Sequence, residues 1–195
     1  FDPCADTTSQ MSYCTIEYGY LVHQIADCDT LLGALSFYQS SAHINHCLFW
    51  NNGTSSLYYL DAVSYPLRHN RFRASVFAGI HCVNSRLDAF DNNFDYNRYG
   101  ILYENAALGT IADNSFVNNA EAVRCKNSSP TIENNNLDNN SQGTSCIDGV
   151  ASMIQNNIII HGQIGFYCEN SWPTIMNNVF TAMRTSIICN ASTPY

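Results

Sequence analysis

The chain has 195 residues, which is enough for one domain with a buried core. Its 16 acidic and 8 basic residues give a net charge of −8, and this balance excludes the clustered positive charge that a nucleic-acid-binding surface needs. No apolar run reaches the roughly 20 residues of a bilayer-spanning helix, so we expect no membrane span. Nine cysteines together with few lysines favour an exported protein, extracellular or on the cell surface.

A repeat-like pattern is already present near the N-terminal end, in MSYCTIEYGY. Met11, Cys14 and Ile16 occupy the positions that an apolar residue, an asparagine and a large apolar residue occupy in later repeats. The next copy follows after one repeat length plus about eleven residues, so residues 19–33 contain an insertion, which forms a short helix or a loop leaving the repeat. Insertions on one face of a repeat protein often carry function, which makes this segment a candidate binding site.

Two cysteines are placed to fasten this insertion. Cys28 lies within it, and Cys4 falls, by its spacing, in the same column of the repeat as Cys168. We therefore predict a disulfide between Cys4 and Cys28 that holds the insertion against the first coil.

An apolar residue followed three positions later by asparagine recurs every 21–23 residues. The apolar residues are Ile44, Leu67, Ala89, Ile111, Ile132, Ile154 and Ile175. The asparagines are Asn70, Asn92, Asn114, Asn135, Asn157 and Asn178, and Cys47 takes the place of the first. Two residues further on, a large apolar side chain completes each unit: Phe49, Phe72, Phe94, Phe116, Leu137, Ile159 and Phe180. A fixed period over nearly the whole chain predicts a repeat fold.

A second pattern lies upstream in each unit, where apolar and polar residues alternate as in a strand with one buried face. The inward pairs expected in the first coils are Leu35 and Phe37, Tyr58 and Leu60, and Ile80 and Cys82. Units of this length hold two or three short strands and no crossover helix, so they stack as coils with parallel strands about 4.8 Å apart. Leucine-rich repeats need more leucines, and propeller blades need about twice the period. We predict an all-β parallel solenoid of about eight coils, a single domain over residues 1–195.

The recurrent asparagine has a structural explanation. Asparagine tolerates the left-handed backbone of a tight bend, and its amide can both donate to and accept from the asparagine one coil away. We therefore interpret the column from Asn70 to Asn178 as an internal hydrogen-bond ladder and not as a ligand site.

The units G-I-x-C-x-N-S and P-T-I-x-N-N-x-F resemble the right-handed parallel β-helix repeats of pectate-lyase-like surface proteins. An F-x-x-N element, seen from Phe49 to Asn52, Phe94 to Asn97 and Phe116 to Asn119, is similar to that of polymorphic outer-membrane adhesins. The resemblance covers almost all residues and implies a right-handed parallel β-helix. It is compatible with several activities, because this scaffold carries lyases, hydrolases, adhesins and passive stalks.

Four cysteines share one inward column on the last coils: Cys125, Cys146, Cys168 and Cys189. Four stacked coils would spread their sulfurs over roughly 14 Å, whereas tetrahedral zinc needs a compact cluster, so this column excludes a four-thiolate metal site. In-register parallel strands also aim neighbouring Cβ atoms in the same direction, which strains a disulfide. We expect buried free thiols here, no metal site and no cofactor.

In enzymes of the resembled fold, the chemistry lies on the outer face of a strand groove, here beside the inward cysteine column. The residues expected there are Tyr59, Asp61, His81, Glu104, Arg124, Lys126, Tyr167 and Glu169. The candidate acids are Asp61, Glu104 and Glu169. Two coils, roughly 9.6 Å, would separate the first two, which is near the carboxyl separation of inverting glycosidases. The other five are candidate ligand contacts, among which Arg124 and Lys126 suit an acidic sugar.

Two observations speak against catalysis on this face. Solvated strand faces carry mixed charges by default, and like-facing neighbours such as Glu104 and Lys126 pair across coils. The adjacent aspartates and the arginine arrangement expected of pectinolytic members of the fold are not visible in the sequence.

The leading interpretation is a non-enzymatic segment of an exported β-helical surface protein, acting as an adhesive or structural rod. Neither end shows the polar cap that terminal repeats need, which predicts a segment of a longer protein. Flanking coils of that protein, or identical subunits joined end to end into filaments, are the expected partners, with glycans as a further class. The alternative is a polysaccharide-active enzyme, a lyase or glycoside hydrolase, or a carbohydrate-binding module that uses the face between Asp61 and Glu169.

Overall fold

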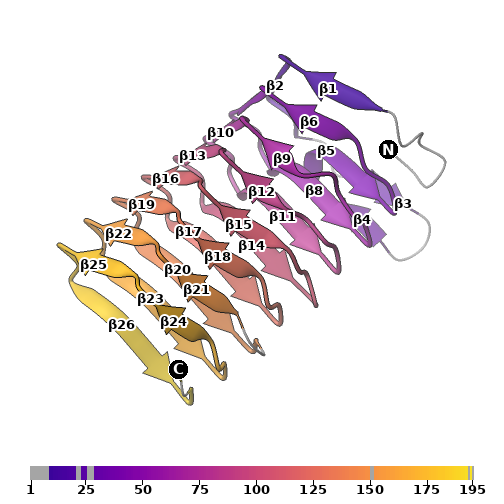
Figure 1. Cartoon of the computed structure of the whole chain (residues 1–195). Coiled ribbons are helices and arrows are strands. Elements are labelled where there is room, and N and C mark those ends of the chain that lie inside the picture. The colour runs from indigo at the N-terminus through magenta and orange to yellow at the C-terminus, as the bar shows by residue number, and fades with distance from the viewer. Residues whose placement is uncertain (1–8, 21–22, 26–28, 150–151, 193, 195) are drawn as a thin grey trace.

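A computed structural model of the chain shows a right-handed parallel β-helix (Figure 1). It describes residues 9–20, 23–25, 29–149, 152–192 and 194. The secondary structure assigned to these residues consists of strands, turns and bends, and no helix among them is long and apolar enough to cross a membrane. The predicted all-β solenoid is therefore confirmed, with three strands in each coil.

Three parallel sheets of eight strands run along the rod, and every coil contributes one strand to each. Sheet 1 contains β1 (Gln10–Ser12), β6 (His43–Asn45), β9 (Leu67–Arg68), β12 (Ala89–Phe90), β15 (Thr110–Ala112), β18 (Thr131–Glu133), β21 (Met153–Gln155) and β24 (Thr174–Met176). Sheet 2 contains β2 (Thr15–Glu17), β7 (Leu48–Trp50), β10 (Arg71–Arg73), β13 (Asn93–Asp95), β16 (Ser115–Val117), β19 (Asn136–Asp138), β22 (Ile158–Ile160) and β25 (Val179–Thr181). Sheet 3 contains β5 (Gly33–Tyr38), β8 (Ser55–Leu60), β11 (Ala78–Val83), β14 (Tyr99–Glu104), β17 (Glu121–Lys126), β20 (Gln142–Ile147), β23 (Ile164–Glu169) and β26 (Thr185–Asn190).

The core fills the centre of the rod, where the inward side chains of the three sheets meet. Parallel in-register pairing places equivalent residues of successive coils directly above one another, so each inward position becomes a continuous column. The apolar column of sheet 1 and the phenylalanine column of sheet 2 are buried as predicted, except in the last coil, where Ile175 and Phe180 are partly buried. Rings of neighbouring coils in the second column stack, for example Phe72 on Phe94 with centroids 4.9 Å apart.

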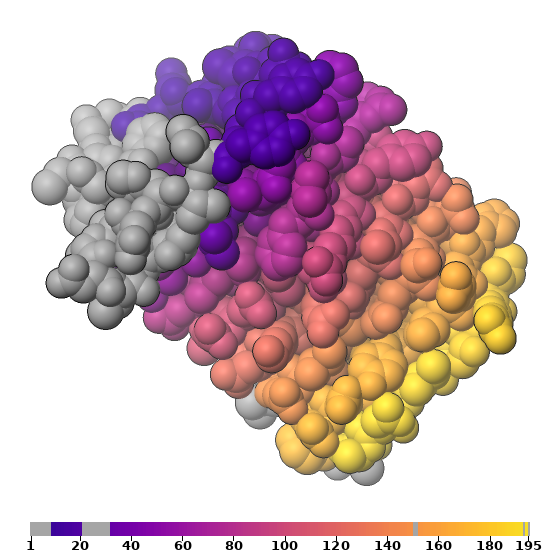
Figure 2. Space-filling model, turned by 180° about the vertical axis from the view of Figure 1, so that it is seen from behind, coloured from indigo at the N-terminus to yellow at the C-terminus, as the bar shows by residue number. Residues whose placement is uncertain are grey.

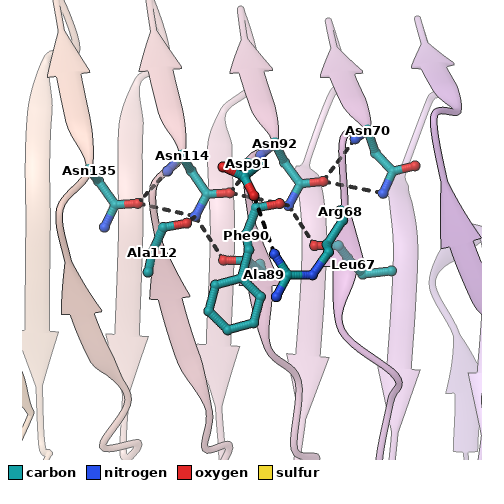
Figure 3. Close-up of polar contacts among 10 residues, drawn as sticks. All are labelled: Leu67, Arg68, Asn70, Ala89, Phe90, Asp91, Asn92, Ala112, Asn114 and Asn135. Carbon is teal, nitrogen blue, oxygen red and sulfur yellow. Dashed lines mark hydrogen bonds and ion pairs between the residues drawn. The ribbon is translucent and has the colours of Figure 1, made fainter.

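The asparagine ladder is present along sheets 1 and 2 (Figure 3). The backbone N–H of Asn92 donates to Oδ1 of Asn114 at 2.9 Å, and the Asn114 N–H donates to Oδ1 of Asn135 at the same distance. Nδ2 of Asn114 donates to the carbonyl oxygens of Ala89 and Ala112, at 2.9 and 2.8 Å. Each amide thereby satisfies buried backbone groups in its own coil and in its neighbours.

The left-handed residue of the bend is not the ladder asparagine but the residue before it. Asn134 has φ 55°, whereas its neighbour Asn135 holds the ladder contacts. The sequence interpretation had assigned both properties to one position, and the bend divides them between two. The exposed residue before each ladder position only has to tolerate the left-handed backbone conformation, so Tyr13, His46 and Asp91 also occur there.

A second ladder, between sheets 2 and 3, was not predicted. The backbone N–H of Asn97 donates to Oδ1 of Asn119, and that of Asn119 donates to Oδ1 of Asn140, both at 2.9 Å. Its sequence signal was the F-x-x-N element, because the asparagine three residues after Phe94 and Phe116 lies in this second bend, directly after the residue with positive φ. Ser75 takes this place after Phe72. The F-x-x-N element therefore has a structural role in this chain.

The described residues of the insertion include two short strands, β3 (His23–Ile25) and β4 (Asp29–Leu31), which pair antiparallel, where a helix or a loop was expected. The predicted disulfide between Cys4 and Cys28 lies outside the described residues. The predicted cysteine column is confirmed: Cys125, Cys146, Cys168 and Cys189 pair in register, and all four are free thiols. The first three are buried as predicted, whereas Cys189 on the last strand of the sheet is exposed.

Candidate functional site

Two of the predicted surface residues are placed elsewhere by the register of sheet 3. Tyr59 pairs with Cys82 and Phe37, so it belongs to the inward column; it is fully buried and stacks on Phe37 with ring centroids 4.7 Å apart. A shift of one residue exchanges the two faces of a strand, and β8 reads S-S-L-Y-Y-L with apolar side chains on both faces. The inward pair of this coil is therefore Leu57 and Tyr59, and the prediction that Tyr59 contacts a ligand is wrong.

Asp61 lies in the bend after β8, where its backbone has φ 51°. Nδ2 of Asn84, the equivalent bend residue of the next coil, donates to Oδ1 of Asp61 at 2.6 Å. The predicted strand-face pair of Asp61 and Glu104 is therefore wrong, because the two residues occupy different columns. Asp61 is displaced because the bend begins directly after Leu60.

The other six predicted residues do lie on the outer face of sheet 3. One column holds His81, Arg124 and Tyr167, with Leu102 and Ser145 between them. The next outward column, two residues further along each strand, holds Glu104, Lys126 and Glu169, in that order toward the C-terminal end. Figure 2 shows the rod from behind, with its coils as successive bands across the surface.

His81 and Glu104 form the first polar contact of this face. Nε2 of His81 lies 2.8 Å from Oε2 of Glu104, and the imidazole is buried between the rings of Tyr58 and Phe77. The hydrogen bond from His81 holds the pKa of the Glu104 carboxyl below its ordinary value, against the opposing effect of burial. Nδ1 of His81 is buried, with no hydrogen-bond partner recorded among the described residues.

Glu121 is a site residue that the sequence analysis missed. Its carboxyl group lies against three outer-face side chains: it accepts a short hydrogen bond from Ser145 Oγ, a longer one of 3.4 Å from Gln142, and pairs with Arg124 at 3.4 Å. Burial raises the pKa of Glu121, although Ser145 and Arg124 act in the opposite direction. The available signal was a lone charged residue at the start of β17, at a position where the neighbouring strands carry tyrosine and glutamine.

Toward the C-terminal end of the rod, neighbouring side chains on the outer face of sheet 3 are hydrogen-bonded to one another. The Tyr167 hydroxyl donates to Glu169 Oε2 at 2.7 Å and accepts from Asn190 Nδ2 at 3.1 Å. All three candidate acids therefore have an internal partner: Asn84 for Asp61, His81 for Glu104 and Tyr167 for Glu169.

Chemically, the face offers two carboxyl groups whose pKa values are shifted in opposite directions, with an arginine between them. Arg124 contacts Glu121 directly and also contributes to lowering the pKa of Glu104. Divergent carboxyl pKa values are a property of acid–base pairs in enzymes, and structural ion-pair networks produce them as well. The site thus contains a candidate proton donor and a candidate proton acceptor. The side chains around them already form hydrogen bonds and ion pairs with one another.

The fold and this site define the chain as a right-handed β-helix protein, and comparison with known families agrees. Residues 78–193 match the family model described as right handed beta helix region, and residues 23–130 match the one described as periplasmic copper-binding protein (NosD). Each match covers more than half of the chain, which therefore belongs to the right-handed β-helix family and, through its N-terminal part, to the NosD family. No curated protein matches the chain.

The description of the NosD family raises the question of a copper site. In the part of the chain that the structure describes, no group of three or more histidine, cysteine, aspartate or glutamate side chains is arranged to hold a metal ion. Within the matched range, Cys47, Cys82 and Cys125 are buried, and the Cys47 N–H is itself a donor to the asparagine ladder. These residues do not fit a copper centre with three protein ligands.

Proposed function

We propose that this chain is a non-enzymatic segment of an exported β-helical protein, with an adhesive or structural role. One observation carries the proposal: the candidate acids Asp61, Glu104 and Glu169 each bind an internal partner, so their carboxylates are already engaged in contacts within the rod. Export is supported by the NosD family match, whose description is periplasmic, and by the cysteine-rich composition.

The alternative, a polysaccharide-active enzyme, would use the opposite pKa shifts of Glu104 and Glu121, but the register places these residues five positions apart along neighbouring strands, roughly 17 Å between their Cα atoms. In such an enzyme Glu121 would be the proton donor, because its raised pKa keeps it protonated to higher pH. Glu104 would be the base, because its lowered pKa keeps it ionised to lower pH. Activity would then fall when the pH rises through the pKa of Glu121, and also when the pH falls through the pKa of Glu104.

The two functions are separated by measuring reducing-sugar release and unsaturated-product formation from a panel of plant and bacterial polysaccharides across pH 3 to 9. We expect no turnover above the rate without protein, for the wild-type chain and for Glu104→Gln and Glu121→Gln. A bell-shaped pH profile that is lost in both variants would establish the enzyme and end the structural interpretation. Heat-treated protein controls for contaminating hydrolases.

We also propose that the sheet edges formed by β24, β25 and β26 pair with an identical subunit. The strands β24, β25 and β26 are the last of their sheets, so one edge of each carries unpaired backbone groups (Figure 1). Ile187, which continues an inward column, is 42% exposed there. Apolar side chains and free strand edges in one plane suit addition of another coil.

If identical subunits add end to end, the sedimentation coefficient of the isolated chain should increase with concentration, and Ile187→Lys should remain monomeric at the same concentrations. The inserted charge would be buried without a partner between two coils. Val179→Lys is the matched control: it is 53% exposed in the same coil, but on the outer side of sheet 2, and should associate like the wild type. A wild-type chain that stays monomeric up to millimolar concentration would contradict assembly from identical subunits.

A further inference from the structure

Two thiols are neighbours across the first two coils, in the bend between sheets 1 and 2. Cys14 lies between β1 and β2, and Cys47 lies at the equivalent place between β6 and β7. The strands before and after these bends pair in register, so Cys47 is the direct neighbour of Cys14 in the next coil. Cys14 is exposed and Cys47 is buried, and both are free thiols.

The sulfur of Cys47 is turned toward the first coil, which contains β1 and β2. Sγ of Cys47 donates to the carbonyl oxygen of Asn45 in its own coil, at 3.3 Å, and to that of Met11 in the first coil, at 3.7 Å. In the asparagine ladder, Nδ2 of Asn92 makes the same two kinds of contact. The thiol therefore occupies the position of a ladder amide and reaches the coil in which Cys14 lies.

The two thiols also affect each other electrostatically. Burial raises the pKa of the Cys47 thiol, and the neighbouring Cys14 thiol adds to this rise, while backbone hydrogen bonds oppose it. Cys14 is exposed, so it is the thiol that a reagent in solution reaches first. An accessible thiol thus lies beside a shielded one, which is the arrangement of an attacking and a resolving cysteine.

The place of these cysteines in the coil allows a disulfide. Neighbouring coils are about 4.8 Å apart, and disulfides need about 4.4–6.8 Å between Cα atoms. In the cysteine column of sheet 3, both partners lie within strands, where parallel side-chain directions strain the bond. Cys14 and Cys47 lie outside the strands, each directly after a left-handed residue, Tyr13 or His46. Strain that remains would make the bond easier to reduce, and therefore reversible.

A bond at this place would fasten the first coil and the insertion together. In the described part of the chain, the first coil is attached through two strand pairs, β1 with β6 and β2 with β7. The whole insertion, residues 19–33, lies between Cys14 and Cys47 in the sequence, and the N–H of Gly19 at its start donates to Oδ1 of Asn52 in the second coil at 2.9 Å. A crosslink closes this stretch into a loop, which lowers the conformational entropy of the state in which the first coil has opened.

We infer that Cys14 and Cys47 form a reversible disulfide after export, and that this bond locks the first coil and the base of the insertion onto the rod. The oxidant is itself a disulfide, either of a small thiol such as glutathione or of a protein. The Cys14 thiolate attacks one sulfur of the oxidant and one thiolate leaves; the Cys47 thiolate then attacks the Cys14 sulfur of the mixed disulfide and the second thiolate leaves. The two cysteines lose two protons and two electrons, and the oxidant is reduced to two thiols.

The inference rests on export, which is part of the proposed function, because disulfides persist in compartments outside the cytoplasm. It adds a modification site that neither the adhesive role nor the enzymatic alternative uses. The oxidant is supplied in the test below, so failure of the bond to form would leave the proposed function standing. Sugar release would remove the non-enzymatic role without any effect on the thiols.

The test equilibrates the whole 195-residue chain with a series of ratios of oxidised to reduced glutathione, alkylates the remaining thiols and maps linked peptides by mass spectrometry. We expect a peptide containing Cys14 linked to one containing Cys47, absent in Cys14→Ser and in Cys47→Ser. Amide hydrogen exchange in β1 and β2 should slow at least about tenfold when the wild type is oxidised, and stay unchanged in both variants. Serine is compatible with the fold, because Ser171 holds the equivalent position in another bend and donates to two carbonyl oxygens in the same way.

Cys189→Ser is the matched control. Cys189 is also exposed and in register with a buried cysteine, Cys168, but both lie within strands. The linked peptides of the first coil and the slowing of exchange in β1 and β2 should therefore be the same in this variant as in the wild type.

Three results would overturn the inference. The first is a bond from Cys14 to Cys4 or Cys28 in place of Cys47. The second is that both thiols stay free at the most oxidising ratio. The third is that exchange in β1 and β2 does not slow although the bond has formed, which would show that the crosslink locks nothing.

Discussion

Asn114→Ala is expected to lower the free energy of unfolding by about 3–5 kcal/mol, because several buried backbone groups lose their partner at once. The backbone N–H of Asn92 loses its acceptor, and the carbonyl oxygens of Ala89 and Ala112 lose their donor (Figure 3). Each buried group left unsatisfied costs about 1–3 kcal/mol, and a water that enters the space of the lost amide restores only part of these hydrogen bonds. Chemical denaturation followed by circular dichroism measures the loss.

Asn136→Ala is the control for this substitution. Asn136 lies directly after Asn135, is exposed, and uses its backbone N–H to donate to the carbonyl oxygen of Asn114. Alanine keeps that N–H, so the free energy of unfolding should change by less than about 0.5 kcal/mol. Equal effects of Asn114→Ala and Asn136→Ala would show that the ladder amides contribute no more than surface asparagines.

The fold was predictable because a repeat reduces the problem to one dimension. Once the period of 21–23 residues was established from Ile132, Asn135 and their equivalents, parallel stacking fixed the sheets, the core and the ladder together. The period does not determine the direction of a side chain within a strand whose two faces are both apolar. Tyr58 and Tyr59 are adjacent, and only the register with Cys82 shows which of them faces the core.

The site was harder to predict, because its contacts join residues at positions where the type of side chain does not recur from coil to coil. Glu121 binds Ser145 in the next coil, although Glu121 belongs to none of the columns that the alternation defined. His81 was placed on the correct face, but its burial depends on the rings of Tyr58 and Phe77, which come from two different positions in the repeat. Columns give the position of a residue along the rod, whereas these contacts depend on side-chain length and rotamer.

Phe94→Ala should lower the free energy of unfolding by about 3–5 kcal/mol. It should also split unfolding into two separate transitions, one for each half of the rod. Phe94 is fully buried in a stack in which its ring lies 4.9 Å from Phe72 and 4.7 Å from Phe116, so the substitution opens a cavity in the middle of the rod. Phe94→Leu should cost less, because leucine already continues this column at Leu137 and leaves a smaller cavity.

The division of the transition follows from the connectivity of a solenoid. Each coil contacts only its neighbours, so a weak interface in the middle uncouples the two halves, whereas a weak end coil frays alone. Phe180→Ala, in the last coil and only partly buried, should therefore lower stability less than Phe94→Ala and leave one transition for the remaining coils. Denaturant titration followed at several wavelengths distinguishes the two: coincident single transitions for Phe94→Ala would show that the rod unfolds as one cooperative unit and that coupling between coils exceeds the lost packing.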